Sequence, residues 1–260
     1  MKKVTKIRSK KNQEFGQIMG IKVLSTTLPE LLIGVESLIS HNVKFYILTP
    51  NPEIILMARK NKNLKNALNG TDLAIPDGVG LKFAIPGLKI IKGRELFSDL
   101  ITLAAKKKWK VFLLGGLEDE AELTARKLKI LNLKLKIEYA RGPKLNENGE
   151  PATEIDKKLE KDATDKINKL APQILFVAFG NPKQEIWVHE NYSKLNIGGA
   201  MAVGGAFRYA AGQVSLPPRW MAGLGLEWLW RVLTEPKRIG RILNATIVFP
   251  VKLFLYKISD

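Results

Sequence analysis

The sequence predicts an α/β fold in which a mostly parallel sheet is flanked by helices. Three apolar runs, at residues 45–48, 110–114 and 173–179, have the length and composition of buried strands. Glycine, proline or asparagine follows each run, and an amphipathic stretch with helical spacing comes next. Strands that alternate with helices in this way pair in parallel, so a single sheet with helices on its faces is the simplest arrangement.

Composition limits the classes of function that fit this fold. The 260 residues are enough for one domain with a substantial core and a short appendage. The absence of cysteine excludes disulfides and thiolate chemistry, and two histidines leave little for a zinc site. The 42 Lys and Arg against 25 Asp and Glu give a net charge of +17, which indicates an anionic partner. Nucleic acid, anionic lipid and a phosphorylated substrate all fit this charge.

We divide the chain into three regions. Residues 1–16 form a basic leader without the apolar core of a signal peptide, so we expect a loose leader and a cytoplasmic protein. Residues 17–215 hold the sheet domain, which opens with a strand near 18–24 and a helix over 28–39. Residues 216–260 form a basic, amphipathic appendage.

A buried run that ends in polar residues marks the first predicted edge of a ligand crevice. The strand at 45–48 stops at Thr49, and Asn51 then caps a helix that begins at Pro52. A short strand after that helix closes on Asp77, between a proline and a glycine. Ligands of open α/β sheets bind beyond the carboxyl ends of strands, so these polar residues should meet there. Asp77 has no basic neighbour in the sequence and suits a general base, although an ordinary turn residue is equally compatible.

The middle of the chain continues the alternation. An amphipathic helix at 95–107 precedes the strand at 110–114, which breaks at Gly115 and Gly116 before another helix. Backbone N–H groups in such a turn can approach a phosphate or a sugar. The full dinucleotide fingerprint is missing, and a purely structural tight turn is the alternative. The acidic residues 118–120 lie in the first helical turn, where they complement the helix dipole.

A charged surface helix is predicted over 153–170. It follows a strand near 133–139 and a long exposed loop at 141–151. Its apolar residues predict an inward-facing stripe that consists of Ile155, Leu159, Ile167 and Leu170.

The last two predicted strands also end in small or polar residues. Glycine turns follow the strands at 173–179 and 197–203, and the first of these turns leads into a helix whose opening turn faces the crevice. These residues complete the predicted crevice as substrate-binding candidates, and they are Gly180, Asn181, Gln184, Glu185, Gly204 and Gly205.

The appendage is helical, aromatic and basic. Its longest uncharged stretch, 242–251, is too short to span a bilayer and contains Pro250. Aromatic and aliphatic residues beside lysine and arginine are typical of a helix in the lipid headgroup layer. The alternative is a helix packed on the domain, and both hold if one face docks and the other meets lipid. Three arginines can line one side of the appendage, namely Arg231, Arg238 and Arg241.

Metal-binding patterns are missing from the sequence. It contains no D-x-D pair and no His, Asp or Glu cluster with metal-ligand spacing. We therefore expect no metal and no cofactor. Cationic side chains, such as the arginines of the appendage, would then neutralise a diphosphate in place of Mg²⁺.

Taken together, the motifs resemble the WecG/TagA/CpsF family of glycosyltransferases over roughly residues 17 to 245. Each motif is weak by itself, but the ordered set is specific. The motifs are Thr49-Pro50-Asn51, Pro76-Asp77-Gly78-Val79-Gly80, Phe112-Leu113-Leu114-Gly115-Gly116, Gly180-Asn181-Pro182-Lys183-Gln184-Glu185, Val203-Gly204-Gly205-Ala206-Phe207, Gly225-Leu226-Glu227-Trp228-Leu229-Trp230-Arg231 and Glu235-Pro236-Lys237-Arg238.

The resemblance implies a Rossmann-like domain and an inverting, metal-independent transfer of a sugar. The donor would be a UDP-sugar, and the acceptor a polyprenyl-diphosphate-linked sugar at the inner face of the plasma membrane. Well-known members transfer N-acetylmannosamine to undecaprenyl-diphosphate-GlcNAc in wall teichoic acid synthesis. The resemblance also implies that Asp77 is the catalytic base and that Thr49, Asn51 and Gln184 line the reaction pocket.

The appendage arginines match a family element that is thought to close over the site and touch the diphosphate. Ile90, Arg208 and Leu216 depart from the family pattern, which leaves the donor sugar and the acceptor open. A non-catalytic basic α/β protein that binds anionic membrane or nucleic acid is the alternative function. The sequence has no nucleic-acid-binding motif, so we expect no nucleic acid partner. A nicotinamide oxidoreductase is disfavoured by the missing fingerprint, and a homo-oligomer is compatible with the sequence.

Overall fold

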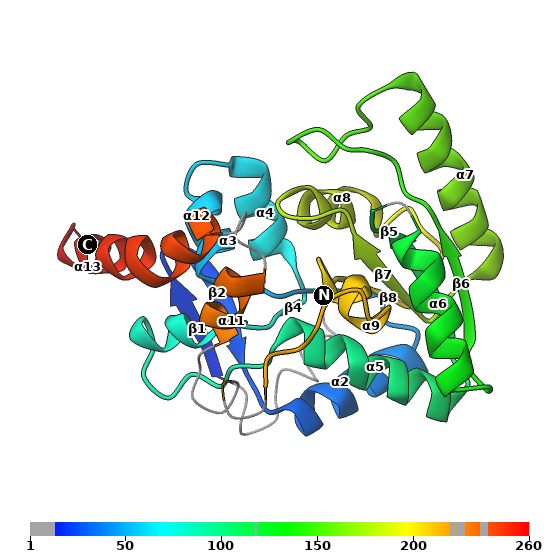
Figure 1. Cartoon of the computed structure of the whole chain (residues 1–260), viewed down its shortest axis with the longest axis horizontal. Coiled ribbons are helices and arrows are strands. Elements are labelled where there is room, and N and C mark those ends of the chain that lie inside the picture. Colours follow the sequence, from blue (N-terminus) through cyan, green and yellow to red (C-terminus); the bar gives the residue numbers. More distant parts are fainter. Residues whose placement is uncertain (1–13, 118, 219–220, 222–226, 235–238, 260) are drawn as a thin grey trace.

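A six-stranded sheet forms the centre of the protein, and all of its neighbouring strands are parallel (Figure 1). The computed structural model describes residues 14–117, 119–218, 221, 227–234 and 239–259. The strand order is β4-β3-β8-β7-β5-β6, which confirms the predicted mostly parallel sheet. The bounds are β3 (Phe45–Leu48), β4 (Leu73–Ala74), β5 (Lys110–Gly115), β6 (Lys136–Ala140), β7 (Ile174–Ala178) and β8 (Gly199–Ala202).

Helices cover both faces of this sheet and enclose two apolar layers. Strand residues alternate between the layers, so that Phe112 and Leu114 face one cluster while Val111 and Leu113 face the other. One layer is closed by α3 (Pro52–Ala58), α4 (Lys62–Gly70), α7 (Glu154–Leu170) and α8 (Lys183–Asn191). The opposite layer is closed by α2 (Leu28–Ser40), α5 (Gly93–Lys107), α6 (Glu120–Leu131) and α9 (Ala206–Ala210).

The N-terminal strand that the sequence predicts is in fact a hairpin. Strands β1 (Glu14–Ile18) and β2 (Ile21–Ser25) pair antiparallel in a separate two-stranded sheet. Met19 and Gly20 both have positive φ, 48° and 80°, and turn the chain between the strands. Residues 14–16 are therefore ordered by pairing with β2 and do not belong to a loose leader, while residues 1–13 lie outside the described part of the chain.

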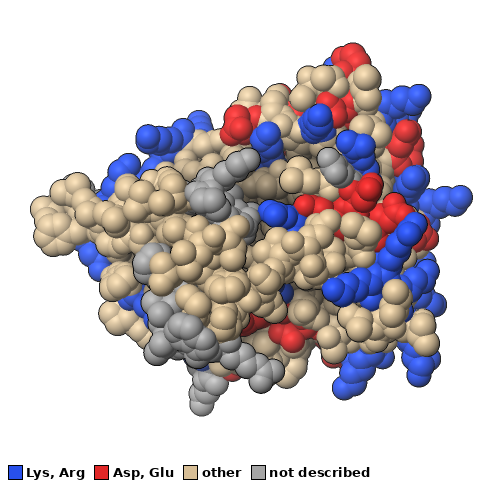
Figure 2. Space-filling model, in the orientation of Figure 1, with Lys and Arg blue, Asp and Glu red and all other residues tan. Residues whose placement is uncertain are grey.

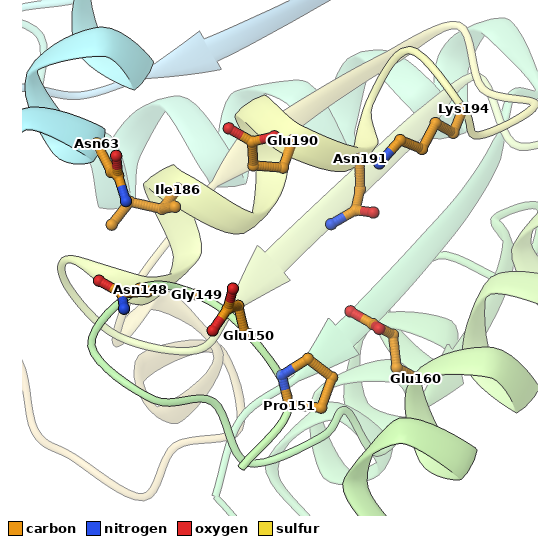
Figure 3. Close-up of a pocket in the computed structure, with 10 residues that line it drawn as sticks. All are labelled: Asn63, Asn148, Gly149, Glu150, Pro151, Glu160, Ile186, Glu190, Asn191 and Lys194. Carbon is orange, nitrogen blue, oxygen red and sulfur yellow. The ribbon is translucent and has the colours of Figure 1, made fainter.

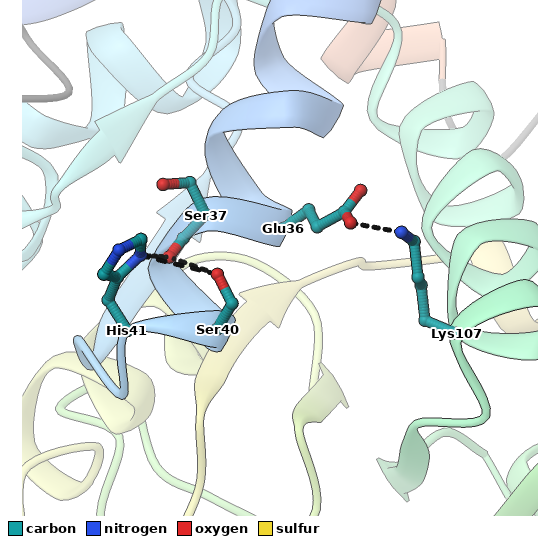
Figure 4. Close-up of polar contacts among 5 residues, drawn as sticks. All are labelled: Glu36, Ser37, Ser40, His41 and Lys107. Atoms are coloured by element: carbon teal, nitrogen blue, oxygen red, sulfur yellow. Dashed lines mark hydrogen bonds and ion pairs between the residues drawn. The ribbon is translucent and has the colours of Figure 1, made fainter.

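Side-chain caps fix where the helices begin. Thr27 and Glu30 form a capping box at the start of α2, in which the Thr27 backbone N–H donates to Glu30 Oε2 at 3.0 Å. The other end of α2 is closed by His41, whose Nδ1 lies 2.8 Å from the Ser37 carbonyl oxygen (Figure 4). Lys107 at the end of α5 forms an ion pair with Glu36 of α2, so these two helices are also joined at the surface.

The predicted stripe on the helix at 153–170 is wrong at its first position. Ile155 is 75% exposed, whereas the next residue, Asp156, is buried. Asp156 accepts hydrogen bonds from the Thr153 hydroxyl at 2.6 Å and from the Lys144 backbone N–H at 2.8 Å. These bonds lower the pKa of Asp156 and hold the preceding loop against the helix. Leu145 in this loop is buried, although the loop was predicted to be exposed.

The C-terminal segment is helical, as predicted. It contains α11 (Glu227–Thr234), α12 (Ile239–Leu243), the π-helical η3 (Asn244–Val248) and α13 (Phe249–Ser259). Phe249 and Leu253 are buried in the same apolar layer as α3 and α4, so one face of α13 docks on the domain. Within the described residues, none of the helices combines the length and the hydropathy that crossing a membrane requires.

Candidate functional site

The carboxyl ends of the parallel strands define one edge of the sheet, where the predicted site residues gather. The connection that leaves β5 leads to β6 on one side, while the connection that leaves β7 leads to β8 on the other. Strands β5 and β7 are neighbours, so the chain diverges between them. Such a divergence leaves space for a ligand between the loops that follow the strands.

Asp77 lies at this edge, in the loop that follows β4. Its backbone N–H donates to the carbonyl oxygen of Pro50 at 2.9 Å, which ties this loop to the one after β3. The backbone N–H of Gly93, the first residue of α5, donates to Asp77 Oδ2 at 3.2 Å. The half-buried carboxylate therefore sits at the N-terminus of α5, where the helix dipole favours a negative charge.

Thr49 converges on the same point as Asp77. A Cβ atom at Gly93 would lie 3.1 Å from Thr49 Oγ1 and 3.3 Å from Asp77 Oδ2, so the hydroxyl and the carboxylate approach one glycine. Asn51 is close in sequence but has a clear local role, because its Oδ1 accepts the Ile54 backbone N–H at 3.0 Å and caps α3. The structure thus brings Thr49 and Asp77 together and uses the Asn51 oxygen to start a helix.

The buried Gln184 side chain connects the loop after β7 to the loop after β8. Only 3% of it is exposed, and its Oε1 accepts the backbone N–H groups of Gly180 at 3.2 Å and Gly204 at 3.0 Å. Its Nε2 donates to Asn181 Oδ1 and to Glu185 Oε1, both at 2.8 Å. The prediction places Gln184 in the reaction pocket, and the structure shows that its carboxamide is engaged with these protein groups.

Glu185 is equally buried, at 2% exposure. It lies in the first turn of α8, as predicted, and the Gln184 contact described above orients its carboxylate. A carboxylate at a helix N-terminus is favoured by the helix dipole, which helps to offset the cost of burying the charge.

The glycine pair at the end of β5 has a packing role. Both residues have positive φ, 92° at Gly115 and 85° at Gly116. A Cβ at Gly115 would lie 2.9 Å from the ring of Phe179, and a Cβ at Gly116 would lie 2.8 Å from Cβ of Glu120. The predicted alternative of a structural tight turn therefore accounts for both glycines by itself.

The glycines after β7 and β8 are in more open surroundings. Gly180 is exposed with a φ of 77°, and a Cβ there would meet no described atom within 4 Å. Gly204, with a φ of 52°, and Gly205 are half-buried, and Gly205 precedes α9 directly. Gly180 and Gly204 leave more room than Gly115 and Gly116, because a Cβ at Gly204 would come no closer than 3.7 Å to the Gln184 side chain.

Two arginine contacts at this edge were not predicted. Arg208 of α9 pairs with the buried Glu120 at the start of α6, with 3.5 Å between Nε and Oε1. Glu120 Oε2 also accepts the Leu117 backbone N–H at 3.0 Å and closes the glycine turn. Arg94, in the first turn of α5, lies over the ring of Tyr209 with 5.1 Å to the ring centroid. Arg208 stands out in the sequence as a departure from the family pattern, but its partner lies on a distant segment.

The appendage arginines are described only in part. Arg231 lies on α11 and Arg241 on α12, but their side chains and the whole of Arg238 lie outside the described part of the structure. Ile90, at the first departure from the family pattern, packs against the apolar layer. Lys92 and Arg94 flank Gly93, the residue that binds Asp77.

A separate hollow of about 360 Å³ lies between the loop at 148–151, α7 and the outer side of α8 (Figure 3). Glu150, Glu160 and Glu190 line it together with Lys194. None of the predicted site residues that the structure describes lines this hollow. Among the described residues, no group of three or more His, Cys, Asp and Glu side chains is placed to hold a metal ion.

The fold is that of an α/β protein with a parallel sheet, and its candidate ligand site, with a carboxylate and glycine turns, lies beyond the carboxyl ends of the strands. The sequence model of the Glycosyl transferase WecG/TagA/CpsF family matches residues 16–260. The chain therefore belongs to this family and is a glycosyltransferase, as the motifs indicate.

Two curated relatives carry the same name, N-acetylglucosaminyldiphosphoundecaprenol N-acetyl-beta-D-mannosaminyltransferase. The protein from Bacillus spizizenii is 29% identical over 217 residues, which cover 79% of this chain and 77% of the relative. The protein from Staphylococcus aureus is 28% identical over 263 residues, which cover 97% of this chain and 95% of the relative. The similarity therefore extends through the sheet domain and the C-terminal helices.

Proposed function

We propose that this chain transfers N-acetylmannosamine or a related sugar from a UDP-sugar to a polyprenyl-diphosphate-linked N-acetylglucosamine. The observation that carries the proposal is the convergence of Thr49 and Asp77 on Gly93 at the ligand edge of the sheet. The names of the relatives support the acceptor and the transferred sugar. The polymer would be a cell-wall polysaccharide or a teichoic acid, made at the inner face of the plasma membrane.

Asp77 is the proposed general base. Its carboxylate would take the proton from the acceptor hydroxyl as that oxygen attacks the anomeric carbon of the donor. The bond from the anomeric carbon to the diphosphate oxygen breaks in the same step, and UDP leaves with the electron pair from the opposite face. The configuration at the anomeric carbon is thereby inverted. The hydrogen bond from Gly93 supports this role because it holds the carboxylate at the edge.

The negative charge that develops on the UDP leaving group needs stabilisation. We propose that protein cations supply it without a metal ion. The candidates are the arginines of the appendage, Arg231, Arg238 and Arg241. The net charge of +17 supports a site and a surface that attract polyphosphate and anionic lipid.

The test is Asp77→Asn. The amide oxygen of the new side chain can still accept the Gly93 N–H, so the fold and UDP binding should persist while the base is lost. We expect kcat to fall by about a hundredfold to ten-thousandfold, with UDP affinity near that of the wild type. Release of UDP with a panel of UDP-sugars and a lipid-diphosphate-GlcNAc analogue, in the presence of EDTA, measures both donor choice and metal dependence.

Asp162→Asn, at an exposed position of α7, is the matched control and should keep full activity. Wild-type turnover by Asp77→Asn would show that Asp77 is not the base. Turnover that stops in EDTA and returns with Mg²⁺ would contradict the metal-independent part of the proposal.

A further inference from the structure

An arginine and a glutamate from distant segments of the chain meet at the ligand edge. Arg208, in α9, pairs with Glu120 at the start of α6, and their side chains are 30% and 9% exposed. Figure 2 shows acidic side chains over the start of α6, to the right of the centre of the view, with basic side chains beside them. The contact is made through Nε of Arg208, so Glu120 binds the side of the guanidinium nearest the main chain and orients its outer N–H groups.

Glu120 also belongs to the turn at the end of β5. Its Oε2 accepts the Leu117 backbone N–H at 3.0 Å, and a Cβ at Gly116 would lie 3.1 Å from the same oxygen. The Gly116 backbone N–H donates to the carbonyl oxygen of Ala178, the last residue of β7, at 2.8 Å. The pair of Arg208 and Glu120 therefore lies where the chain diverges between β5 and β7, the place where open α/β sheets bind their ligands.

The backbone around Arg208 is fixed by both neighbouring helices. The buried Thr124 hydroxyl of α6 donates to the carbonyl oxygen of Phe207 at 2.9 Å. Phe207 is itself buried and directly precedes Arg208. The next residue, Tyr209, stacks with Arg94 of α5. The position of Arg208 is therefore set by the protein before any ligand arrives.

Stability by itself does not explain the ion pair. Its Nε–Oε1 distance is 3.5 Å and the arginine is partly exposed, so the pair adds little to the free energy of unfolding. The uncharged bond from Thr124 already joins α6 to α9. A guanidinium that is held in a fixed orientation, in contrast, offers parallel N–H groups to two oxygens of a phosphate. The arrangement therefore favours an anionic ligand.

The strand order relates this arginine to the proposed base. Asp77 follows β4 at one margin of the sheet, whereas Arg208 follows β8 and pairs with a residue that follows β5. In the proposed reaction, the acceptor oxygen attacks the anomeric carbon from the side of Asp77, and the diphosphate leaves from the opposite side. A donor whose sugar lies beside Asp77 can therefore extend its diphosphate along the edge toward Arg208.

We infer that Arg208 binds the diphosphate of the UDP-sugar donor, and that Glu120 is the residue that positions it. The inference rests on the proposed function and deepens it, because it assigns a phosphate ligand to the sheet domain in addition to the arginines of the appendage. When the bond to the anomeric carbon breaks, its electron pair stays on the diphosphate oxygen. N–H donors that are already in place stabilise this charge with little reorganisation.

The test compares the affinities of Arg208→Gln for UDP and for uridine, measured by isothermal titration calorimetry. We expect UDP to bind at least about tenfold more weakly than to the wild type, because charge-assisted hydrogen bonds to phosphate are lost. Uridine has no phosphate and should bind as it does to the wild type. Arg208→Lys keeps the charge without the planar geometry, so its affinity for UDP should lie between the two.

Arg126→Gln is the matched control. Arg126 lies on α6, pairs with Glu122 and contacts Tyr139 of β6, and its side chain is 70% exposed. The substitution removes an arginine from an ion pair of the same helix on the side of β6. It should leave the affinity for UDP unchanged. The melting temperature of each variant should stay close to that of the wild type, which checks the fold.

The positioning role of Glu120 is tested with Glu120→Gln, alone and together with Arg208→Gln. The amide oxygen of the new side chain can still accept the Leu117 N–H, but the charge that orients Arg208 is lost. We expect the single variant to bind UDP about threefold more weakly. The double variant should bind UDP as Arg208→Gln does, because Glu120 acts through Arg208. Losses that simply add in the double variant would contradict this role.

The outcomes separate this inference from the proposed function. Equal affinity of the wild type and Arg208→Gln for UDP would overturn the inference and leave the proposed function intact. A wild type that does not bind UDP would overturn the proposed donor and the inference with it. In turnover, Arg208→Gln should raise KM for the UDP-sugar and leave KM for the lipid-diphosphate-GlcNAc analogue unchanged. The reverse pattern would overturn the inference and assign Arg208 to the diphosphate of the acceptor.

Discussion

Gln184 offers the sharpest test of how the ligand edge is held together. Gln184→Met keeps the length of the side chain and removes its four polar contacts. Gly180 is exposed, so its N–H can bind water, but Gly204, Asn181 and Glu185 lose a partner in a half-buried or buried place. At about 1 kcal/mol for each of these three hydrogen bonds, the substitution should lower the free energy of unfolding by about 3 kcal/mol.

This loss is large enough to measure by two methods. In a chain of this size we expect the melting temperature to fall by about 10 °C, and urea unfolding should show a lower midpoint with an unchanged slope. Gln17→Met, at an exposed position of β1, is the control and should change the melting temperature very little. Turnover at a temperature where the variant is fully folded reports on the chemical role of the side chain.

The result that would refute this reasoning is specific. A melting temperature within about 2 °C of the wild type, together with a loss of kcat as large as that of Asp77→Asn, would mean that Gln184 acts on the substrate and does not hold the two loops together. The expected result is the reverse, a clear loss of stability with a smaller change in kcat.

Two further predictions concern the same scaffold. Thr153 and Lys144 donate hydrogen bonds to Asp156 and lower the pKa of its carboxyl group below the ordinary value of 3.8. The ionised carboxylate therefore stabilises the fold at pH values above 3.8, and this contribution is lost as the pH falls through the lower pKa of the folded state. Asp156→Asn should flatten this acid-dependent part of a pH series of melting temperatures. Gly115→Ala should lower the free energy of unfolding by about 2 kcal/mol or more, because of the positive φ and the contact with Phe179, and urea unfolding measures this.

Strands β3, β5 and β7 were predictable from the sequence because each is a short apolar run with a glycine or proline close behind it. Phe45–Leu48 and Ile174–Ala178 are buried throughout, as strands in the middle of a parallel sheet are, so each appears in the sequence as a short, unbroken apolar run. The order of the strands could not be predicted. It depends on which helix packs on which face, and that is decided by contacts between distant segments.

Buried polar groups explain where the sequence reading failed. Periodicity assigned Ile155 to the core, but Asp156 is buried there because Thr153 and the Lys144 backbone satisfy its carboxylate. Gln184 is expected at the crevice because it follows a glycine turn at a strand end, and the family resemblance implies a place in the reaction pocket, which stays a prediction. Its hydrogen bond to Gly204, 20 residues later, depends on the pairing of β7 with β8 and leaves no mark in the local sequence.

The two halves of the ligand edge are joined by contacts between helices. Asp77 is held by the first residue of α5, and Gly204, which Gln184 holds, lies just before α9. The stacking of Arg94 on Tyr209 connects α5 to α9, so the carboxylate side and the glycine side belong to one packed unit. Groups that are fixed by the protein before substrate arrives stabilise developing charge with little reorganisation. This arrangement suits a reaction in which one carboxylate accepts a proton while negative charge forms on the departing diphosphate.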